Sequence, residues 1–155
     1  MTSEVTYQRG VLGLGKECES VLRTVPEWFG REDSIQHYIE DINKMETSTA
    51  WHNDQLIGFY AVNFHFPKVA ELHVLAVRKE YHRAGIGGEL YKRVEDELKE
   101  KGAKFIQVKT LSPRAKNVDY QKTYEFYMKH GFTPLEDFDE LWGEDTPSIQ
   151  LIKGI

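Results

Sequence analysis

Cysteine is almost absent from this chain of 155 residues, in which Cys18 is the single thiol. One cysteine excludes an internal disulfide framework and a cysteine-based zinc site, and it suits a reducing compartment. We expect Cys18 to be a small core residue rather than a nucleophile. No His, Asp and Glu cluster has metal-ligand spacing, so the sequence predicts no metal site.

Long apolar runs and an excess of basic residues are also missing. No run approaches the roughly 18–20 apolar residues that a membrane-spanning helix needs, and the first ten residues lack the basic and apolar regions of a secretory signal. The net charge of −5 argues against wholesale electrostatic binding to nucleic acid or an anionic membrane. We therefore expect a cytoplasmic protein with no nucleic-acid or membrane partner.

The composition that is present is that of a globular protein, with 40% hydrophobic and 29% charged residues. These values argue against disorder and against a fibrous repeat. No linker rich in Pro, Gly or Ser divides the chain, and its length suits one hydrophobic core. We expect a single domain over residues 1–155.

The apolar periodicity predicts the element order β-α-α-β-β-β-α-β-α-β-β. Antiparallel meanders come first and a βαβ unit follows. The expected fold class is therefore α/β (α+β), with a mixed, mainly antiparallel central sheet and helices on both faces. Strands are expected near residues 4–9, 48–53, 55–64, 70–77, 104–110, 132–135 and 148–153, and helices near 16–25, 32–45, 86–101 and 119–130.

Two glycine-rich stretches are candidates for anion binding. The first, GVLGLGKE at residues 10–17, nearly satisfies the phosphate-binding pattern G-x-x-x-x-G-K-S/T. Glu17 stands where a hydroxyl should ligate Mg²⁺, and a carboxylate there would repel phosphate. We expect a plain turn that enters the first helix, and a nucleotide-phosphate hydrolase is the least favoured interpretation.

The second stretch, HRAGIGG at residues 82–88, lies between the strand ELHVLAV and an amphipathic helix. A glycine weakens a helix interior by about 0.5–1 kcal/mol relative to alanine, so glycines at a helix start need a reason. The first N–H groups of a helix lack partners and attract an anion, which glycines let approach closely. A structural turn with packing glycines is the alternative. Basic residues surround this loop: Arg78, Lys79, Arg83, Lys92 and Arg93.

This second stretch resembles the acetyl-CoA-binding motif of the GNAT N-acetyltransferase superfamily, Q/R-x-x-G-x-G/A between a strand and a helix. The sequence here reads H82-R-A-G85-I-G87, with His82 in place of Gln or Arg. ELHVLAV resembles the central strand of that family and YEFYMKHGF its second conserved helix. The resemblance covers residues 48–135 and implies a GNAT-like fold, with acetyl-CoA as co-substrate and no metal.

The resemblance also implies which residues bind acetyl-CoA and which carry the chemistry. Tyr127, five residues before Phe132, would protonate the departing thiolate, since a phenol with a pKa of about 10 is protonated at neutral pH. Glu71 would be the general base, with His73 as the alternative; His65 and His52 are weaker candidates, and a structural carboxylate without a dedicated base stays open. The cofactor-binding residues would be Leu75, Ala76, Val77, His82, Arg83, Ala84, Gly85, Ile86, Gly87 and Gly88.

The expected activity is direct acetyl transfer, in a ternary complex, to a primary amine of a small molecule or peptide. A non-catalytic acyl-CoA-binding or regulatory module that kept the fold is the alternative, and a homodimer is considered as an assembly. We expect the acceptor to be recognised by residues 26–30 (PEWFG), by Trp51 and by the segment after Leu135. Residues 136–145, EDFDELWGED, contain six carboxylates and no basic residue. They predict either attraction of a cationic amine or merely a solvated acidic loop.

Overall fold

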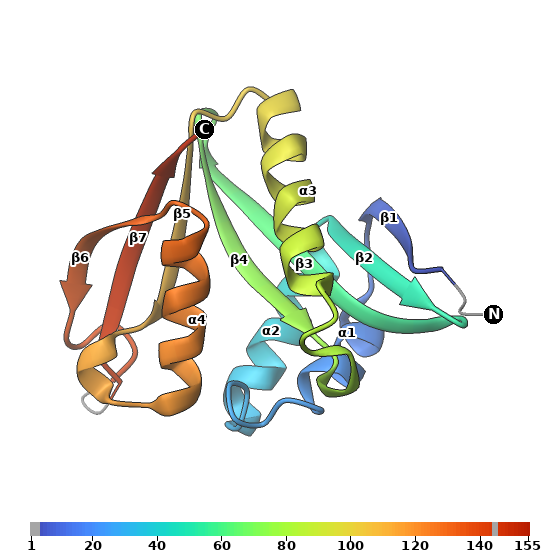
Figure 1. The fold of residues 1–155 in the computed structure, drawn as a ribbon, viewed down its shortest axis with the longest axis horizontal. Helices are drawn as coiled ribbons and strands as arrows, with labels where there is room; N and C mark the ends of the chain where they lie inside the picture. Colours follow the sequence, from blue (N-terminus) through green and yellow to red (C-terminus); the bar gives the residue numbers. More distant parts are fainter. Residues whose placement is uncertain (1–3, 144–145) are drawn as a thin grey trace. The chain divides into compact units, whose positions relative to one another are not determined.

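The strands and helices follow one another in the predicted order β-α-α-β-β-β-α-β-α-β-β (Figure 1). The structure is a computed structural model that describes residues 4–143 and 146–155. The strands are β1 (Thr6–Val11), β2 (Thr47–His52), β3 (Gln55–Phe66), β4 (Val69–Val77), β5 (Phe105–Leu111), β6 (Thr133–Phe138) and β7 (Ser148–Gly154). The helices are α1 (Gly15–Leu22), α2 (Glu32–Lys44), α3 (Ile86–Glu100) and α4 (Val118–Lys129), with the 3-10 turns η1 (Lys79–Tyr81) and η2 (Pro113–Ala115).

Hydrogen bonds join the strands in the order β1-β2-β3-β4-β5-β7-β6. The pairs β1–β2, β2–β3, β5–β7 and β7–β6 are antiparallel, whereas β4 and β5 pair in parallel, with Glu71 opposite Gln107. Asn53 and Asp54 connect β2 to β3 with positive φ angles of 50° and 63°, which suits a tight hairpin turn of type I′. The predicted mixed and mainly antiparallel sheet is confirmed.

Several predicted boundaries differ from the observed ones by two or three residues, among them both ends of β1 and the end of β6, and two of the differences have a clear local cause. Helix α1 ends at Leu22 rather than near residue 25, because the Thr24 N–H bonds to the Val21 carbonyl three residues back and tightens the chain. Strand β3 continues to Phe66 and stops before Pro67, which has no N–H to donate to a strand ladder. Local turn geometry, not the apolar period, decided both ends.

The chain divides into two compact units. The first unit comprises residues 1–63 and 72–100, and the second comprises residues 64–71 and 101–155. Within residues 4–143 and 146–155, no helix is long and apolar enough to cross a membrane. The expectation of a single domain over the whole chain stays a prediction.

In the first unit, one face of β3 packs on α1 and α2. Phe59 and Ala61 of β3 are fully buried in an apolar cluster with side chains from both helices. Successive strand residues point to opposite faces, so these two share one face. The other buried members of the cluster are Cys18, Val21, Leu22, Ile42, Leu56, Val74 and Ala76.

Cys18 is a core residue, as expected. None of its surface is exposed. Burial, and secondarily the charge of Glu17, raises the pKa of the Cys18 thiol to about 12. The thiolate is the reactive form of cysteine, so Cys18 is inert at neutral pH.

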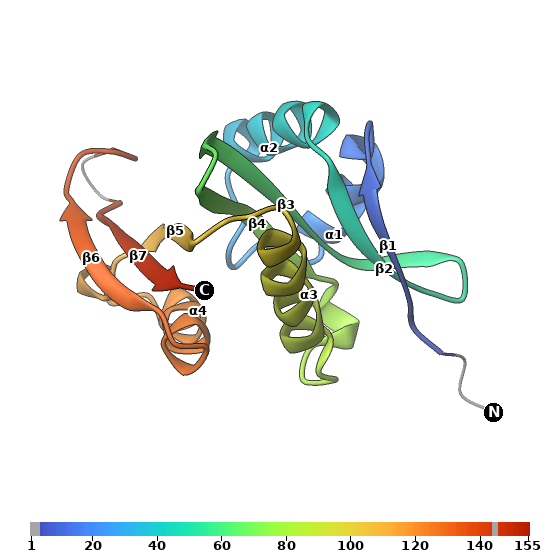
Figure 2. The same cartoon turned by 90° about the horizontal axis from the view of Figure 1, so that it is seen from above.

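The opposite face of β3 packs on α3, and Figure 2 shows α2 and α3 on opposite sides of β3 and β4. A Cβ built on Gly58 would lie 3.0 Å from Cδ1 of Leu90. The Tyr60 hydroxyl donates a 2.9 Å hydrogen bond to the buried Glu97 carboxylate, which also lies 3.4 Å from Arg9. This close packing fixes where α3 lies on the sheet, and the predicted helices on both faces are confirmed.

In the second unit, β5, β7 and β6 form an antiparallel ladder and α4 packs against β5. The Asn117 side chain caps α4 by accepting the N–H groups of Asp119 and Tyr120. The helix ends before Gly131, whose φ of 94° suits glycine. Strand β6 is an edge strand and is mostly exposed.

Gly15, in the stretch that nearly matches a phosphate-binding loop, is required by helix packing. Its N–H donates to Oδ1 of Asn43 at 2.8 Å. A Cβ at Gly15 would lie 2.7 Å from the Ile39 carbonyl oxygen and equally close to the Asn43 amide. This supports the interpretation of residues 10–17 as a turn that enters a helix.

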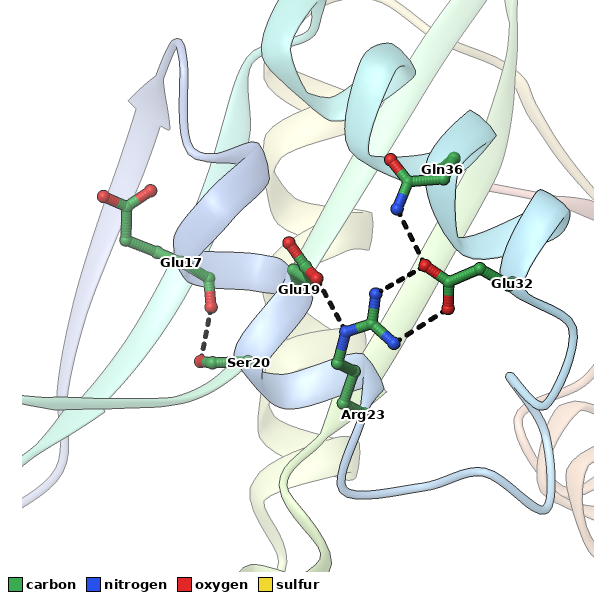
Figure 3. A network of polar contacts seen from close by, with 6 residues as sticks. All are labelled: Glu17, Glu19, Ser20, Arg23, Glu32 and Gln36. Atoms are coloured by element: carbon green, nitrogen blue, oxygen red, sulfur yellow. Dashed lines mark hydrogen bonds and ion pairs between the residues drawn. The ribbon is translucent and has the colours of Figure 1, made fainter.

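The segment that joins α1 to α2 is clamped at both ends by an exposed polar network (Figure 3). Arg23 donates to Glu19 at 2.6 Å and, through two nitrogens, to Glu32 at 2.9 and 2.8 Å. Gln36 also donates to Glu32. These hydrogen bonds, from Arg23 first and then Gln36, lower the pKa of Glu32 from 4.5 to about 2. The network holds residues 24–31 against the ends of the two helices.

We expect Gly15→Ala to destabilise the protein by about 1–3 kcal/mol, because the added methyl group would press on the α2 backbone. The matched control is Gly88→Ala in α3. Outside the adjoining residues and the backbone of α3 itself, no heavy atom of the described residues lies within 4 Å of a Cβ at Gly88. This control should hold or raise stability, by up to about 1 kcal/mol. Urea unfolding measures the free energy of unfolding of both variants. Equal values for Gly15→Ala and Gly88→Ala would contradict the packing role of Gly15.

The Arg23–Glu32 pair should stabilise the fold only above moderately acidic pH. Because folding depresses the pKa of Glu32, its contribution is fully present above about pH 4.5 and is lost as the pH falls to about 2. Glu32→Gln and Arg23→Gln should both be less stable than the parent at pH 6, with a difference that shrinks towards pH 2 and vanishes below it. Denaturant midpoints across this range measure it. A difference that persists unchanged at pH 2 would exclude the ion pair as its source.

Candidate functional site

The loop between β4 and α3 presents backbone N–H groups. Arg83 and Gly85 have positive φ angles of 64° and 81°, a conformation that glycine adopts without steric cost. The Glu89 N–H donates to the Gly85 carbonyl at 3.1 Å. The N–H groups of residues 86–88 precede that bond, so helix geometry gives them no partner within α3. They carry the partial positive charge of the helix start and can bind an anion.

The glycines of this loop are not explained by packing. Apart from the adjoining residues in the chain and the backbone of α3 itself, no heavy atom of the described residues lies within 4 Å of a Cβ built on Gly85 or Gly88. The positive φ accounts for Gly85, but Gly88 lies within α3. The protein itself therefore leaves the space beside Gly88 open, and the packing alternative loses its support there.

His82, the first residue of the motif, makes two contacts through its imidazole ring. Its Nε2 donates to the Val77 carbonyl at 2.8 Å, which requires a proton on that nitrogen. Its ring meets the Trp28 ring edge-on, with centroids 5.9 Å apart. His82 thus connects the end of β4 with the segment between α1 and α2.

Several basic residues around the loop have partners within the protein. Arg78 is buried, with its guanidinium bonded to neighbouring elements, Lys79 pairs with Glu27, and Arg93 pairs with Glu89 at 3.1 Å. The sequence suggested a ring of positive charge, but these partners reduce the charge that is available to a ligand. The anion-binding capacity of this loop would therefore come more from backbone N–H groups than from side chains.

The predicted cofactor strand alternates in burial along its last residues. Ala76 is buried in the core of the first unit, whereas Leu75 and Val77 are half-buried. The role assigned to these residues, along with that of Ala84, Ile86 and Gly87 in the loop, stays a prediction.

Glu71 lies in the second unit with two basic partners. It is 8% exposed; Nε2 of His65 donates to it at 2.7 Å, and Nζ of Lys109 lies 3.4 Å away. A buried carboxylate needs such partners. The sequence underrated His65, although the tight turn of residues 67–68 could have revealed that residues flanking it meet. Because the His65 side chain is 46% exposed, the pair connects a buried carboxylate with the protein surface.

The other histidine candidates are held elsewhere. Nε2 of His73 bonds to Asp41 of α2 at 3.0 Å, and its ring lies against Tyr38. Nδ1 of His52 shares a 2.8 Å hydrogen bond with the Tyr81 hydroxyl. His73 therefore has partners of its own on α2, and the structure connects Glu71 with His65.

Tyr127, the predicted acid, is a buried residue of α4. It is 7% exposed, and its ring lies edge-on to those of Phe126 and Phe132, with both centroids 5.3 Å away. The Phe132 N–H donates to the Tyr127 carbonyl at 3.1 Å, so the end of the Y-x-x-x-G-F pattern caps the helix. The ring position is fixed by packing, and its role as an acid stays a prediction.

The acidic stretch at residues 136–145 has a cationic partner that the sequence pattern did not indicate. Arg114 of η2 pairs with Asp139 at 2.7 Å and with Asp137 at 3.4 Å. No local pattern joins residues so far apart in the sequence. Arg114 offsets part of the negative charge, Trp142 is 41% exposed, and residues 144–145 lie outside the described part of the chain.

Comparisons with known proteins agree with this architecture. The sequence profile of the acetyltransferase (GNAT) family matches residues 17–132. An uncharacterized N-acetyltransferase of Chlorobaculum tepidum is 35% identical over 79 residues. The match covers 51% of this chain, and the chain spans about half the length of that relative.

Two solved structures illustrate the fold. An aminoglycoside 6'-acetyltransferase type Ii has 26% identity and a TM-score of 0.75 over 96% of both chains. A GNAT family acetyltransferase from Elizabethkingia anophelis with acetyl-CoA bound has 21% identity and a TM-score of 0.72, with 97% of this chain and 98% of that one covered. With the profile match over most of its length, the protein described here belongs to the acetyltransferase (GNAT) family.

Proposed function

We propose that this protein is an acetyl-CoA-dependent N-acetyltransferase that moves an acetyl group directly to a primary amine in a ternary complex. The observation that carries the proposal is the start of α3, where N–H groups of residues 86–88 lack helical partners and Gly88 has open space beside it. A diphosphate fits such a site, because it supplies the negative charge that the helix start attracts. We also propose a cytoplasmic location.

The cofactor would be held mainly by main-chain groups. The N–H groups at the start of α3 would bind the diphosphate, and the backbone of residues 75–77 would pair with pantetheine like an added strand. His82, Arg83, Ala84, Gly85, Ile86, Gly87 and Gly88 would form the loop around the phosphates. The similar acetyltransferase from Elizabethkingia anophelis has acetyl-CoA bound, which supports this choice of cofactor.

Two side chains of the second unit would move the protons. The reacting amino group, in its neutral form, bonds through its nitrogen to the carbonyl carbon of the thioester as one of its protons passes, through water, to Glu71. The carbon–sulfur bond then breaks, and the Tyr127 hydroxyl gives its proton to the departing thiolate. The hydrogen bond between Glu71 and His65 supports this assignment, since His65 offers the proton a path to solvent.

The acceptor proposed is a cationic amine. Glu136 and Glu140 lie exposed beside the carboxylates that Arg114 engages. Trp142 adds an exposed ring that can contact a cation. The 26% identical structural relative is an aminoglycoside acetyltransferase, and aminoglycosides carry several amino groups.

Release of free CoA from acetyl-CoA, measured against a panel of cationic, neutral and acidic amines, tests the function. Acetyl-CoA should also raise the melting temperature, since ligand at 100 times its dissociation constant adds about 2.7 kcal/mol of stability. ATP and NAD serve as controls and should have far smaller effects. Binding without turnover on any amine would favour a non-catalytic module, and no binding would exclude the proposal.

We expect Tyr127→Phe to lower kcat by up to about 100-fold, because the variant keeps the ring packing and loses only the acidic hydroxyl. The affinity for acetyl-CoA should stay near that of the parent. Tyr124→Phe, on the same helix, is the matched control and should keep its turnover. Steady-state kinetics under conditions where chemistry limits the rate measure the effect. Equal kcat in the Tyr127 variant and parent would remove Tyr127 from the mechanism.

We expect Glu71→Gln to flatten the acidic limb of the kcat/KM profile, because the amide cannot titrate or accept the amine proton. His65→Gln should lower kcat and leave the KM for acetyl-CoA unchanged, because the variant changes only the proposed route of the proton from Glu71 to solvent. Rates from about pH 5 to 9 measure both. An acidic limb that survives in Glu71→Gln but disappears in His73→Gln would transfer the role of base to His73.

We expect the KM for spermidine to rise with ionic strength, because the charge on exposed carboxylates is screened beyond about 8 Å at 0.15 M salt. Glu136→Gln combined with Glu140→Gln should raise this KM and leave the affinity for acetyl-CoA unchanged. Glu40→Gln combined with Asp54→Asn changes the net charge equally and is the control. A spermidine KM that is indifferent to salt, or equal in the two double variants, would argue for a solvated acidic loop.

A further inference from the structure

The turn that leads from β4 into the cofactor loop is joined to the segment between α1 and α2. The Lys79 N–H donates to the Thr24 hydroxyl at 3.0 Å, and the Lys79 ammonium pairs with Glu27. On the same turn, the Arg78 guanidinium donates to Ser20 of α1 at 2.9 Å. Two segments far apart in the sequence, residues 20–28 and 78–82, are therefore interlocked in the first unit.

His82 forms a further, exposed connection between these segments. Its Nε2–H donates to the Val77 carbonyl at 2.8 Å, while its ring lies edge-on to Trp28, with an interplanar angle of 66°. One imidazole therefore fixes a peptide of β4 and, with its ring, an aromatic side chain of residues 26–30. A Gln in this motif position can donate a hydrogen bond, but it offers no ring to Trp28.

The surface ion pair on the same turn contributes less to this connection. The side chains of Lys79 and Glu27 are 52% and 28% exposed, and exposed pairs contribute little because solvent screens them. An aromatic contact and a hydrogen bond to a main-chain carbonyl are directional and change when either partner moves. The contacts of His82 can therefore transmit a displacement, and they are the ones that reach both the Val77 peptide and the Trp28 ring.

We propose that His82 is a positioning residue that couples Trp28 to the acetyl-CoA site. This inference rests on the proposed function, because it takes the Val77 peptide as part of the cofactor site. Cofactor bound along that peptide fixes its orientation, which holds the imidazole and in turn the Trp28 ring. A ligand that displaces Trp28 should therefore change the affinity for acetyl-CoA. By linkage, bound acetyl-CoA then changes the affinity for that ligand by the same factor.

The first experiment uses Trp28 as the reporter. In a Trp51→Phe and Trp142→Phe background, Trp28 is the remaining tryptophan of the chain. Acetyl-CoA is titrated while its dissociation constant is measured by calorimetry and Trp28 emission is recorded. Saturation should change the emission. In His82→Ala the change should disappear although acetyl-CoA still binds, about three- to tenfold more weakly, as expected for loss of one hydrogen bond.

Two variants separate positioning from general damage. His82→Gln should restore most of the affinity through the Val77 carbonyl without restoring the Trp28 signal. Glu80→Gln, an exposed position on the same turn, should retain both affinity and signal. Loss of the signal in Glu80→Gln would attribute the effect to disturbance of the turn and overturn the role of His82.

A double-variant cycle on the dissociation constant completes the test. Trp28→Leu and His82→Ala should each weaken binding, and the double variant should be no weaker than His82→Ala alone, because both remove the same connection. Additive effects, or emission changes that persist in His82→Ala, would overturn the coupling while the proposed function stands. Absence of acetyl-CoA binding to the parent protein in calorimetry would refute the proposed function itself, and the coupling with it.

Discussion

The unpaired N–H groups at the start of α3 are the constraint on which the rest of the structure depends. A helix must leave its first donors without partners inside the helix, and in this protein those donors lie next to Gly85 and Gly88, where residues from the rest of the described chain leave open space. Such a terminus is useful only if it is held in place. The rest of the first unit supplies that rigidity, because α3 is packed through Leu90 against Gly58 and is tied through Glu97 to Tyr60.

The same requirement explains the density of contacts on the turn before the loop. Arg78 is buried and bonded across the sheet and to α1, Tyr81 is bonded to His52, and His82 joins the strand end to Trp28. A loop that binds an anion mostly through its backbone needs fixed peptide orientations. Side chains that the sequence suggested as cationic ligands instead serve as anchors for those peptides.

The second unit holds the two groups that we propose for proton transfer. Glu71 is buried between two basic partners, one of which reaches solvent, and Tyr127 is packed between two aromatic rings. A buried carboxylate without partners would be costly, so these contacts keep Glu71 within the sheet. Arg114 likewise pairs with Asp137 and Asp139 and offsets part of the negative charge of the acidic stretch.

The sequence by itself determined the order of elements, the mixed sheet and the glycine-rich start of α3, because apolar period, turn residues and helix termini are encoded within a few neighbouring residues. It also indicated the core position of Cys18. Tertiary structure decided which side chains meet: His65 with Glu71, Arg114 with the acidic stretch, and Trp28 with His82. Those partners lie on different elements, and their proximity follows from strand pairing and turn geometry, which no local pattern specifies. The position of the glycine-rich loop between β4 and α3 could therefore be predicted from the sequence, whereas the network that holds the loop was settled only by the fold.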